Sequence, residues 1–242
     1  MLQTLRQPRW LILTVLVVVL AGVFIRLGIW QLDRLGERRD LNAEISARLE
    51  AEPVALEDLL AEADGDLESI EFRRVVAGGV FDPSEEVLIR SQVELGQAGF
   101  HVITPLTGPT AVLVNRGWVP LNMDEPPVDA LAPAGETRVV GWVRLSADRP
   151  ALGREDPAGE VDVFSRVDVE RIGGQVPYPL APVYVVAMGE SDELPVPVDL
   201  PDVEDEGSHL AYAIQWFGFA VVGLVGFYFL VKTKGNGSAG ES

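Results

Sequence analysis

The chain has 242 residues, 48% of them hydrophobic, and a formal net charge of −18. This length accommodates two membrane spans and one mid-sized domain. Residues 33–206 hold 36 acidic and 14 basic residues, so this middle part carries a net charge of −22. Such a surface repels phosphate backbones, so nucleic acid is not expected as a partner. The absence of cysteine excludes disulfides, thiolate metal sites and thiol nucleophiles.

The first predicted element is a transmembrane helix over residues 10–31, preceded by a basic cytoplasmic head at residues 1–9. Residues 11–25 are apolar apart from one threonine. Counting past Arg26 to Trp30 gives a span of about 30 Å, which is enough to cross a bilayer. Arg26 must then reach toward one interface or find a partner. A cleaved signal peptide is the competing interpretation, but no small-residue cleavage site follows, so an uncleaved anchor is expected.

Residues 32–189 are expected to form an extracytoplasmic domain that begins with helix. From Asp33 to about Glu50 apolar residues recur at helical spacing, so the first span should continue as helix until Pro53 breaks it. A short helix is predicted at Leu56–Ala63, ended by Gly65.

The rest of this domain has strand patterns separated by turn residues. Strands are predicted at Phe72–Phe81, Val87–Arg90, Phe100–Leu106, Ala111–Val119, Thr137–Leu145, Val161–Val167 and Val183–Met188. A turn is expected at Gly96–Gly99, and one helical turn at Asp168–Ile172. The spacing favours a mostly antiparallel sheet, or a partly closed barrel, over alternating βα units. The predicted fold class is therefore an α+β membrane protein with a β domain between two terminal spans.

An acidic, Pro-rich connector at residues 190–208 leads into a second predicted transmembrane helix at residues 209–231, followed by a tail at residues 232–242. From Leu210 to Val231 there are 22 residues without a charge, or about 33 Å of helix.

The basic residues predict the orientation of the two spans. No Lys or Arg lies between Arg171 and Lys232, whereas Lys232 and Lys234 follow the second span at once. Because basic flanks stay cytoplasmic, both termini are expected in the cytoplasm and the middle domain outside. Arg34, Arg38 and Arg39, after the first span, argue weakly for the opposite orientation.

Motifs for catalysis are missing from the chain. There is no Gly-x-Ser-x-Gly, no His-Glu-x-x-His and no phosphate-binding glycine loop, so an enzyme is not expected. Adjacent acids such as Glu85-Glu86 and Asp205-Glu206 are typical of a solvated surface. His101 is expected to be a packed or surface histidine, and two histidines without cysteine do not suffice for a closed zinc site.

One face of the second span combines an imidazole with aromatic and small residues. On a helical wheel this face holds His209, Tyr212, Ala213, Trp216, Ala220, Gly223 and Phe227. The plain interpretation is an interfacial aromatic belt and a helix-packing face. The alternative is a haem site, since imidazole is a common axial ligand of haem iron and arginine suits anionic propionates. Arg26 would supply that arginine.

A stripe on the first span could contribute to the same interface. Gly22, Arg26, Trp30 and Asp33 share one face, and Trp30 and Arg34 are neighbours at i,i+4. The alternative is that Arg26 pairs with Asp33 and that His209 only marks the depth of the headgroups.

Three stretches resemble the Surfeit locus family of cytochrome oxidase assembly proteins. They are Leu27–Arg34, which contains Trp30, Gln31 and Arg34; Val112–Pro120, which contains Asn115, Arg116, Gly117 and Trp118; and His209–Phe217. Gly99–Leu106 also has the family's pattern. Together, in this order between two terminal spans, they cover the whole chain.

The resemblance implies an assembly factor in the cytoplasmic membrane for haem-copper (aa3-type) cytochrome c oxidase, one that assists haem a insertion into subunit I. It implies subunit I, haem a synthesis or delivery proteins and the lipid bilayer as partners, and transiently bound haem a as cofactor. The family's proposed haem ligand falls on His209, and the tryptophan of that motif on Trp216. Gln215 and Arg38 depart from the family pattern. A scaffold that stabilises an oxidase intermediate without a cofactor is the alternative.

The Asn115–Trp118 stretch also has a physical interpretation of its own. Gly117 permits a positive φ or close packing where a strand ends, so Arg116 could point toward the membrane interface. The alternative is a structural turn with Trp118 buried in the sheet.

Overall fold

The computed structural model describes residues 8–94, 96–146, 156–191, 193–201, 203 and 206–237. The chain divides into two compact units, one of residues 1–44 with 202–242 and one of residues 45–201. The expectations for Arg6, for Asp205 and for the end of the tail lie outside the described residues.

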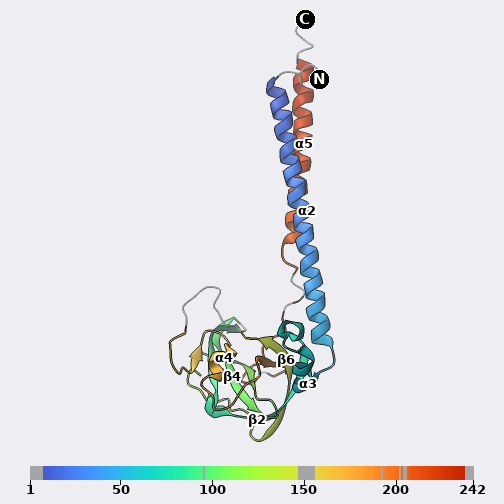
Figure 1. The fold of residues 1–242 in the computed structure, drawn as a ribbon. Coiled ribbons are helices and arrows are strands. Elements are labelled where there is room, and N and C mark those ends of the chain that lie inside the picture. Colours follow the sequence, from blue (N-terminus) through green and yellow to red (C-terminus); the bar gives the residue numbers. More distant parts are fainter. Residues whose placement is uncertain are drawn as a thin grey trace. The chain divides into compact units, whose positions relative to one another are not determined.

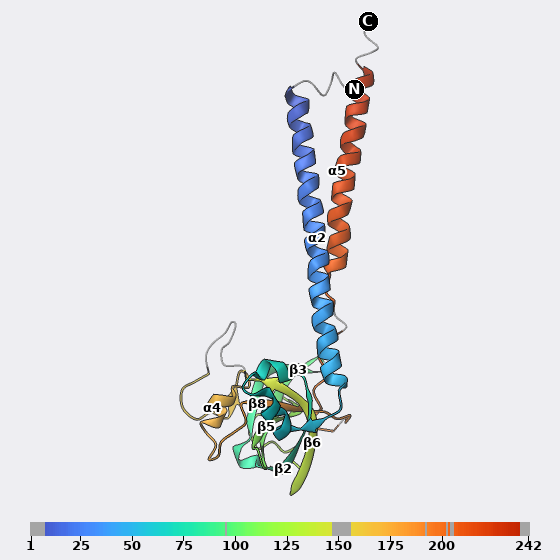
Figure 2. The same ribbon diagram turned by 45° about the vertical axis from the view of Figure 1, so that its right-hand side comes forward.

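The first unit is a pair of helices that run side by side in opposite directions (Figures 1 and 2). α2 covers Pro8–Glu50 and α5 covers His209–Gly237, and both are long and apolar enough to cross a membrane. The prediction that the first span continues as helix through Glu50 is confirmed, although the last residues of α2 belong to the second unit.

Contacts that join α2 to α5 and to the residue Glu206 before it define the register of the helix pair. Phe24 stacks on Trp216 with ring centroids 5.7 Å apart, and Gln31 Oε1 lies 2.8 Å from His209 Nδ1. Further along α2, Arg39 forms a salt bridge of 2.7 Å with Glu206. As α2 advances from Phe24 to Arg39, its partners therefore run back from Trp216 to Glu206, which is an antiparallel packing.

Small residues line the packed faces of both helices. On α2 the buried positions recur every seven residues, at Ala21, Gly28 and Leu35, and on α5 Ala213 and Ala220 are buried at the same spacing. Such small side chains let two helix backbones approach closely. A Cβ on Gly28 would lie only 2.7 Å from the ring of Phe217, so a side chain at this crossing would force that ring to move.

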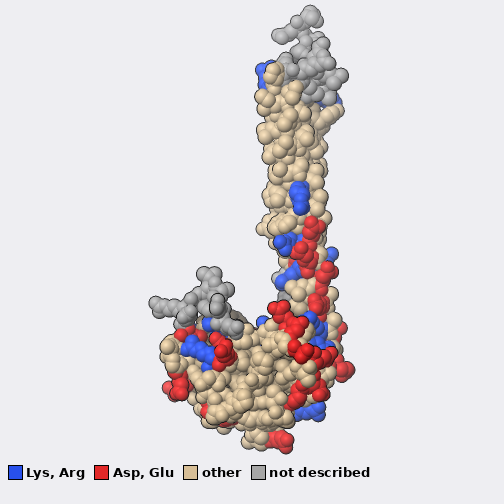
Figure 3. Space-filling view, viewed as in Figure 1, with Lys and Arg blue, Asp and Glu red and all other residues tan. Residues whose placement is uncertain are grey.

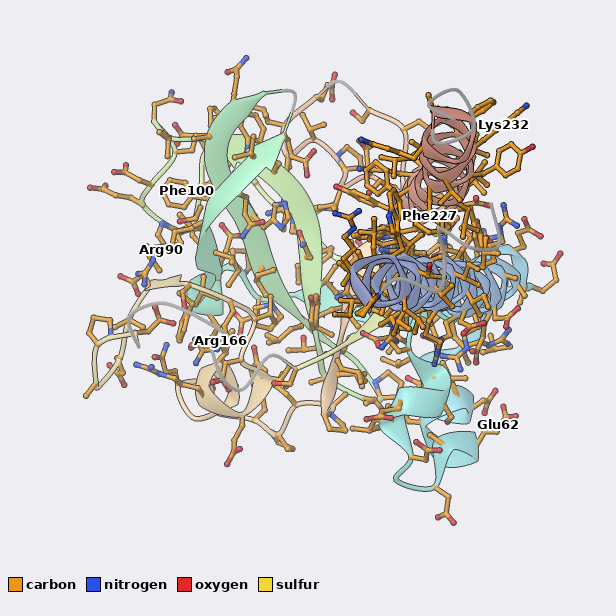
Figure 4. All side chains as sticks on the ribbon, turned by 90° about the horizontal axis from the view of Figure 1, so that it is seen from above. Glu62, Arg90, Phe100, Arg166, Phe227 and Lys232 are labelled. Carbon is orange, nitrogen blue, oxygen red and sulfur yellow. The ribbon has the colours of Figure 1, made fainter. Side chains whose placement is uncertain are left out.

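The predicted face of α5 is only partly the packed face. Ala213 and Ala220 are buried, and His209, Trp216 and Phe227 are half-buried, whereas Tyr212 and Gly223 are exposed. Figure 4, viewed from above, labels Phe227 and Lys232 on α5. In Figure 3 most of the helix pair is uncharged and charged residues gather toward the C-terminal part of α2.

The second unit is a mixed β-sheet with strand order β1-β2-β6-β8-β5-β4-β3-β7. The strands are β1 (Val54–Ala55), β2 (Arg74–Phe81), β3 (Val87–Glu94), β4 (Gln97–Thr107), β5 (Val112–Pro120), β6 (Glu136–Leu145), β7 (Val163–Phe164) and β8 (Val183–Ala187). The helical segments are α3 (Leu56–Ala63), α4 (Val169–Gly173) and the 3-10 turns η1 (Leu67–Ile70) and η2 (Pro83–Glu85).

Antiparallel pairing dominates this sheet, as predicted, but three short pairings among the described strands are parallel. These are β1 with β2, β3 with β7 and β5 with β8. A second pairing of β2, with β4, joins Val80 to Thr107 and Phe81 to Leu106. A ring of β2, β6, β8, β5 and β4 thus rests on only two residue pairs at that point, which gives the predicted partly closed barrel weak support.

Two of the predicted elements are wrong in detail. The turn expected at Gly96–Gly99 is tighter, because Gly96 takes the positive φ (74°) and β4 already starts at Gln97. The strand expected at Val161–Val167 shrinks to the two residues of β7. Its first residue is diverted, since Val161 N and Val161 O bond to the side chain of Gln175 instead of to a neighbouring strand.

The sheet carries apolar clusters on both of its faces. One includes Leu56 and Leu59 of α3 against Val114 and Val185, and the other includes Ile172 of α4 against Leu113. Both predicted short helices are therefore confirmed: Asp168 caps α4 by accepting from Arg171 N, and Asp64 and Gly65 end α3 with positive φ.

Candidate functional site

His209 is the first residue of α5, and its side chain reaches across to α2. The chain enters the helix through Gly207, which has a φ of +68°. His209 Nδ1 lies 2.8 Å from Gln31 Oε1. An amide oxygen can only accept, so Nδ1 carries the proton and donates it. With Nδ1 engaged in this bond, Nε2 is the ring nitrogen that remains for a metal.

An aromatic cluster lies about two helical turns along α5 from His209. Phe24 of α2 contacts both Trp216 and Phe219, with ring centroids 5.7 and 5.8 Å apart, and Trp216 meets Phe219 edge-on at 5.9 Å. Tyr212, one turn before Trp216, is 48% exposed. Aromatic faces of this kind suit a flat apolar ligand. The structure thus brings His209, Trp216 and Tyr212 onto adjoining parts of α5.

Arg26 lies apart from these residues. On the helical wheel of α2 it falls about half a turn away from the packed positions Ala21 and Gly28, and it is exposed. Among the described residues Arg26 has no hydrogen bond or ion pair, and it does not pair with Asp33. The α2 side chain beside His209 is therefore Gln31.

Gln31 is the site residue whose role the sequence did not reveal. The motif that contains it is visible in the sequence, but its contact joins residues 178 positions apart. That contact depends on the register between α2 and α5, and no local pattern in either helix encodes the register.

Trp30 and Arg34 make a local contact on α2, as their i,i+4 spacing predicts. The Arg34 guanidinium lies 5.7 Å from the centroid of the Trp30 ring, and Arg34 Nη1 also pairs with Glu37 at 2.6 Å. Both members of this ion pair are at least half exposed. Trp30 and Arg34 thus lie on the surface of α2, and no described hydrogen bond or ring contact joins them to His209.

The connection into α5 is held by a second pair. Arg39 donates two hydrogen bonds to the carboxylate of Glu206, at 2.7 and 2.8 Å. These bonds lower the pKa of Glu206. The pair attaches the residues just before His209 to the part of α2 beyond the apolar stretch.

The Asn115–Trp118 motif forms a β-bulge within β5, where Ile103 pairs with Asn115 and Val102 with Gly117, so that Arg116 is the extra residue. Gly117 has a φ of +130°, and its N–H donates to Asn115 Oδ1 at 3.0 Å. Trp118 is 4% exposed, and its backbone pairs with Val196 of the connector. A Cβ on Gly117 would lie 2.3 Å from Val196 O. The buried tryptophan of the structural interpretation is confirmed, but the expected turn is a bulge inside the continuous strand β5.

Arg116 is buried in the β domain, which corrects the expectation that it points toward a membrane interface. Its Nη1 lies 3.0 Å from Glu86 Oε2 and its Nη2 lies 2.8 Å from Ala130 O. The same carboxylate accepts from Thr104 Oγ1 at 2.6 Å and from Val128 N at 2.9 Å. Burial lowers the pKa of Arg116, and Glu86 opposes that shift.

Glu86 therefore does not belong to a solvated acidic pair, as Glu85-Glu86 was expected to be. Only 1% of the Glu86 side chain is exposed. The expectation was wrong because a sequence-level charge pattern cannot reveal a cation supplied by a strand 30 residues away. The hydrogen bonds of Arg116 and Glu86 described above all have partners within the β domain. The two residues therefore stabilise the fold and are not placed to bind a ligand.

His101 is a packed histidine, as predicted. Asn115 Oδ1 is occupied by Gly117 N, so the Asn115 amide nitrogen must donate to His101 Nδ1, 3.2 Å away. The proton of this imidazole is then on Nε2, which is 3.7 Å from Glu94 Oε1. Burial lowers the pKa of His101 to about 4, so the ring is neutral.

A cavity of about 350 Å³ lies beside His101 and is also lined by Trp142 and Tyr184. The ring nitrogens His101 Nε2 and Trp142 Nε1 are buried without a hydrogen-bond partner. Neither atom has an open surface toward the cavity. No group of three potential metal ligands occurs in the described part of the chain.

Comparisons with known proteins agree along nearly the whole chain. The model of the SURF1 family matches residues 18–221. The chain is 30% identical over 228 residues to an uncharacterized SURF1-like protein of Mycobacterium tuberculosis, covering 92% of this chain and 83% of that one. It is 29% identical to a SURF1-like protein of Monosiga brevicollis over 95% of this chain and 89% of the relative. Surfeit locus protein 1 of Arabidopsis thaliana is 36% identical over 41% of this chain and 31% of its own length.

Proposed function

The chain belongs to the SURF1 family, and we propose that it assists the assembly of haem-copper (aa3-type) cytochrome c oxidase by helping to insert haem a into subunit I. The family is known in general for oxidase assembly factors. The proposed partners are subunit I and the proteins that make or deliver haem a. The role is that of a non-catalytic chaperone.

One observation carries the haem part of this proposal: His209 donates from Nδ1 to Gln31, which leaves Nε2 as the ring nitrogen for a metal, about two turns along α5 from an aromatic cluster. Haem iron takes an imidazole nitrogen as axial ligand. His209 would hold the iron through Nε2, while Trp216 and Tyr212 lie along the porphyrin. Contact between a propionate and Arg26 stays a prediction. It requires the porphyrin edge to extend around α2, because Arg26 lies on the opposite face of that helix.

We further propose that α2 and α5 cross the cytoplasmic membrane with both termini in the cytoplasm. The helix register supports this arrangement. Phe24 is level with Trp216 and Gln31 with His209. The same register continued toward the termini places Arg9 level with Lys232. The two apolar stretches then coincide, with basic residues at the same end of both helices, as expected for a cytoplasmic side.

A scaffold without cofactor is the second candidate. The hydrogen bond between Gln31 and His209 is also the kind of interhelical bond that stabilises the packing of membrane helices. In that case His209 would serve the helix pair alone, and the partner would be an oxidase intermediate.

Two measurements test the proposal. A deletion strain should lose part of its haem-copper oxidase activity and keep growing. Full activity together with normal haem a content in the membranes would contradict the assembly role.

The second measurement separates the two candidates by haem content. Protein co-expressed with haem a synthesis is purified as wild type, His209→Ala and the control His101→Gln. Only His209→Ala should lose bound haem, since His101 lies in the β domain with its Nδ1 already bonded to Asn115. Equal haem content in wild type and His209→Ala would favour the cofactor-free scaffold.

A further inference from the structure

We propose that Gln31 is a positioning residue, which selects Nε2 of His209 as the metal-binding atom by keeping the proton on Nδ1. The part of this inference that concerns haem binding rests on the proposed function. The tautomer itself is a property of the protein without any ligand. It can therefore be tested separately.

The geometry of the contact leaves one assignment for the proton. Gln31 Oε1 lies 2.8 Å from His209 Nδ1, and both side chains are half-buried in the helix pair. A carbonyl oxygen has no proton to give, so the bond exists only while Nδ1 is protonated. The hydrogen bond made by one ring nitrogen determines which nitrogen is free to bind a metal. Without Gln31 the proton could move to Nε2 and block that atom.

Gly207, two residues before the start of α5, brings no side chain to the other edge of the ring. Gly207 has a φ of +68°, and a Cβ at this position would lie 3.4 Å from His209 Cδ2 and 3.6 Å from Nε2. A longer side chain at residue 207 would therefore lie against the free nitrogen. Gln31 thus occupies Nδ1 on one side, and glycine at position 207 places no side chain against the Nε2 edge on the other.

His101 provides an internal comparison, because its partner has the opposite polarity. Asn115 donates to His101 Nδ1, so the proton of that ring is on Nε2. The structure thus predicts that the two histidines of this chain are opposite tautomers. The assignment can be read directly, since the sequence holds only two histidines.

The first experiment measures the tautomers in the absence of haem. The full chain is labelled with ¹⁵N-histidine, purified through a tag that contains no histidine, and placed in lipid nanodiscs at a pH well above the usual histidine pKa. His209→Ala assigns the two sets of nitrogen resonances. We expect protonated Nδ1 and unprotonated Nε2 for His209, and the reverse for His101. A protonated Nε2 on His209 in the wild type would overturn the inference.

Two substitutions then test whether Gln31 is the cause. Gln31→Met has a similar length but no acceptor, so His209 should lose its Nδ1-protonated pattern. Gln31→Glu retains an acceptor and should keep that pattern. Unchanged His101 resonances show that the β domain of each variant is folded, and an unchanged helical circular dichroism signal shows that its helices are. An unchanged His209 pattern in Gln31→Met would contradict the role of Gln31. If Gln31→Met does not fold, Gln31→Glu provides the test, because loss of the Nδ1-protonated pattern in that variant would also overturn the inference.

The second experiment titrates the same proteins with haemin and follows the Soret band. Removing the partner of a metal-binding histidine typically lowers affinity about 10–100-fold. We expect a loss of that size in Gln31→Met, near wild-type binding in Gln31→Glu, and loss of the histidine-ligated spectrum in His209→Ala. Equal haemin binding by wild type and Gln31→Met would overturn the inference about Gln31 but would not contradict a haem site at His209. No binding by the wild type would overturn the haem site, while the tautomer spectra would still decide the role of Gln31.

Discussion

At the scale of single residues, the two histidines show how a partner determines chemistry. His209 faces an amide oxygen and His101 faces an amide nitrogen, so one ring offers a lone pair on Nε2 and the other a proton. The sequence distinguishes them only by their surroundings in the chain. The buried pair of Arg116 and Glu86 makes the same point, because each residue looks like a surface charge until the other is placed beside it.

The lowered pKa of His101 predicts how stability changes with pH. The folded ring protonates only near pH 4, whereas an unfolded histidine protonates near 6.5. Between these values the unfolded state binds more protons, so the free energy of unfolding falls as the pH falls. From pH 7 to pH 4 the wild type should lose on the order of 2–3 kcal/mol more than His101→Gln. Urea unfolding followed by circular dichroism at both pH values measures the difference.

Glu94, near His101, has a raised pKa because burial disfavours its charge. Its contribution has the opposite sign and is present in both proteins, so it largely cancels in the comparison. Equal losses in wild type and His101→Gln would contradict the buried, neutral state of His101.

The buried ion pair predicts a large cost for removing one partner. Glu86→Gln leaves the guanidinium of Arg116 buried without its counter-charge, since only 7% of the Arg116 side chain is exposed. Breaking a buried pair in this way typically costs about 3–5 kcal/mol. Glu85→Gln is the matched control at the next position, and it should change stability by less than about 0.5 kcal/mol. Similar losses in both variants, measured by urea unfolding, would refute the assignment of Glu86 as the buried partner.

At the scale of elements, the helix pair depends on where its small residues lie. A Cβ on Gly28 would lie 2.7 Å from the Phe217 ring and displace it, whereas Gly22 has open space around it. The two glycines look equivalent in the sequence, since both interrupt the same apolar run. Only the α2 face that packs against α5 makes them different.

This contrast predicts opposite tolerance to the same substitution. Gly28→Leu should overpack the helix pair and destabilise it by about 1–3 kcal/mol, while Gly22→Leu should have little effect. The helix pair of the full chain is titrated with SDS, and the fluorescence of Trp216, which stacks on Phe24, reports separation. Replacing the other four tryptophans by phenylalanine in both variants makes the signal specific. Equal SDS resistance of the two would argue against the observed packing at Gly28.

The strands differ in how well their local patterns predict them. β2, β5 and β6 match their predicted positions within two residues because β-branched residues alternate there with turn residues at both ends. β7 keeps only two residues because Gln175 captures the backbone of Val161. β1 has only two residues, too few for a pattern, and it exists through its parallel pairing with β2.

At the scale of the whole molecule, the acidic and the apolar parts of the sequence are as clearly separated as the β domain and the long helices. The middle of the chain carries −22, while the basic residues Lys232 and Lys234 follow the apolar stretch of α5. A membrane protein oriented by its basic flanks would keep the two ends in the cytoplasm and the acidic middle outside. The acidic surface then suits solubility or a basic partner outside the membrane.

The orientation is tested with reporters fused to truncated chains. A reporter that is active only in the cytoplasm should be silent when fused after residue 195. The same reporter fused after Lys234 should be active, because it follows the second span. Activity at residue 195 together with silence after Lys234 would invert the proposed topology.

The sequence by itself determined the two long apolar helices, most strands of the middle domain, the short helices α3 and α4, and the resemblance of three motifs to one family. These features are local, because neighbouring positions in the chain are enough to show them. The signals are a run of apolar residues, a hydrophobic period of two or 3.6 residues, or a capping residue. Gly117 likewise marked a special backbone position, since glycine in a strand pattern permits the positive φ that the bulge in β5 requires.

Only the tertiary structure decided which residues meet. It placed Gln31 beside His209 and turned Arg26 away, it buried Glu86 against Arg116, and it added three parallel pairings to the sheet. Each of these contacts joins segments that lie far apart in the chain, and each depends on a register between elements. The free energy that sets such a register is summed over a whole interface, so no single stretch of sequence carries it.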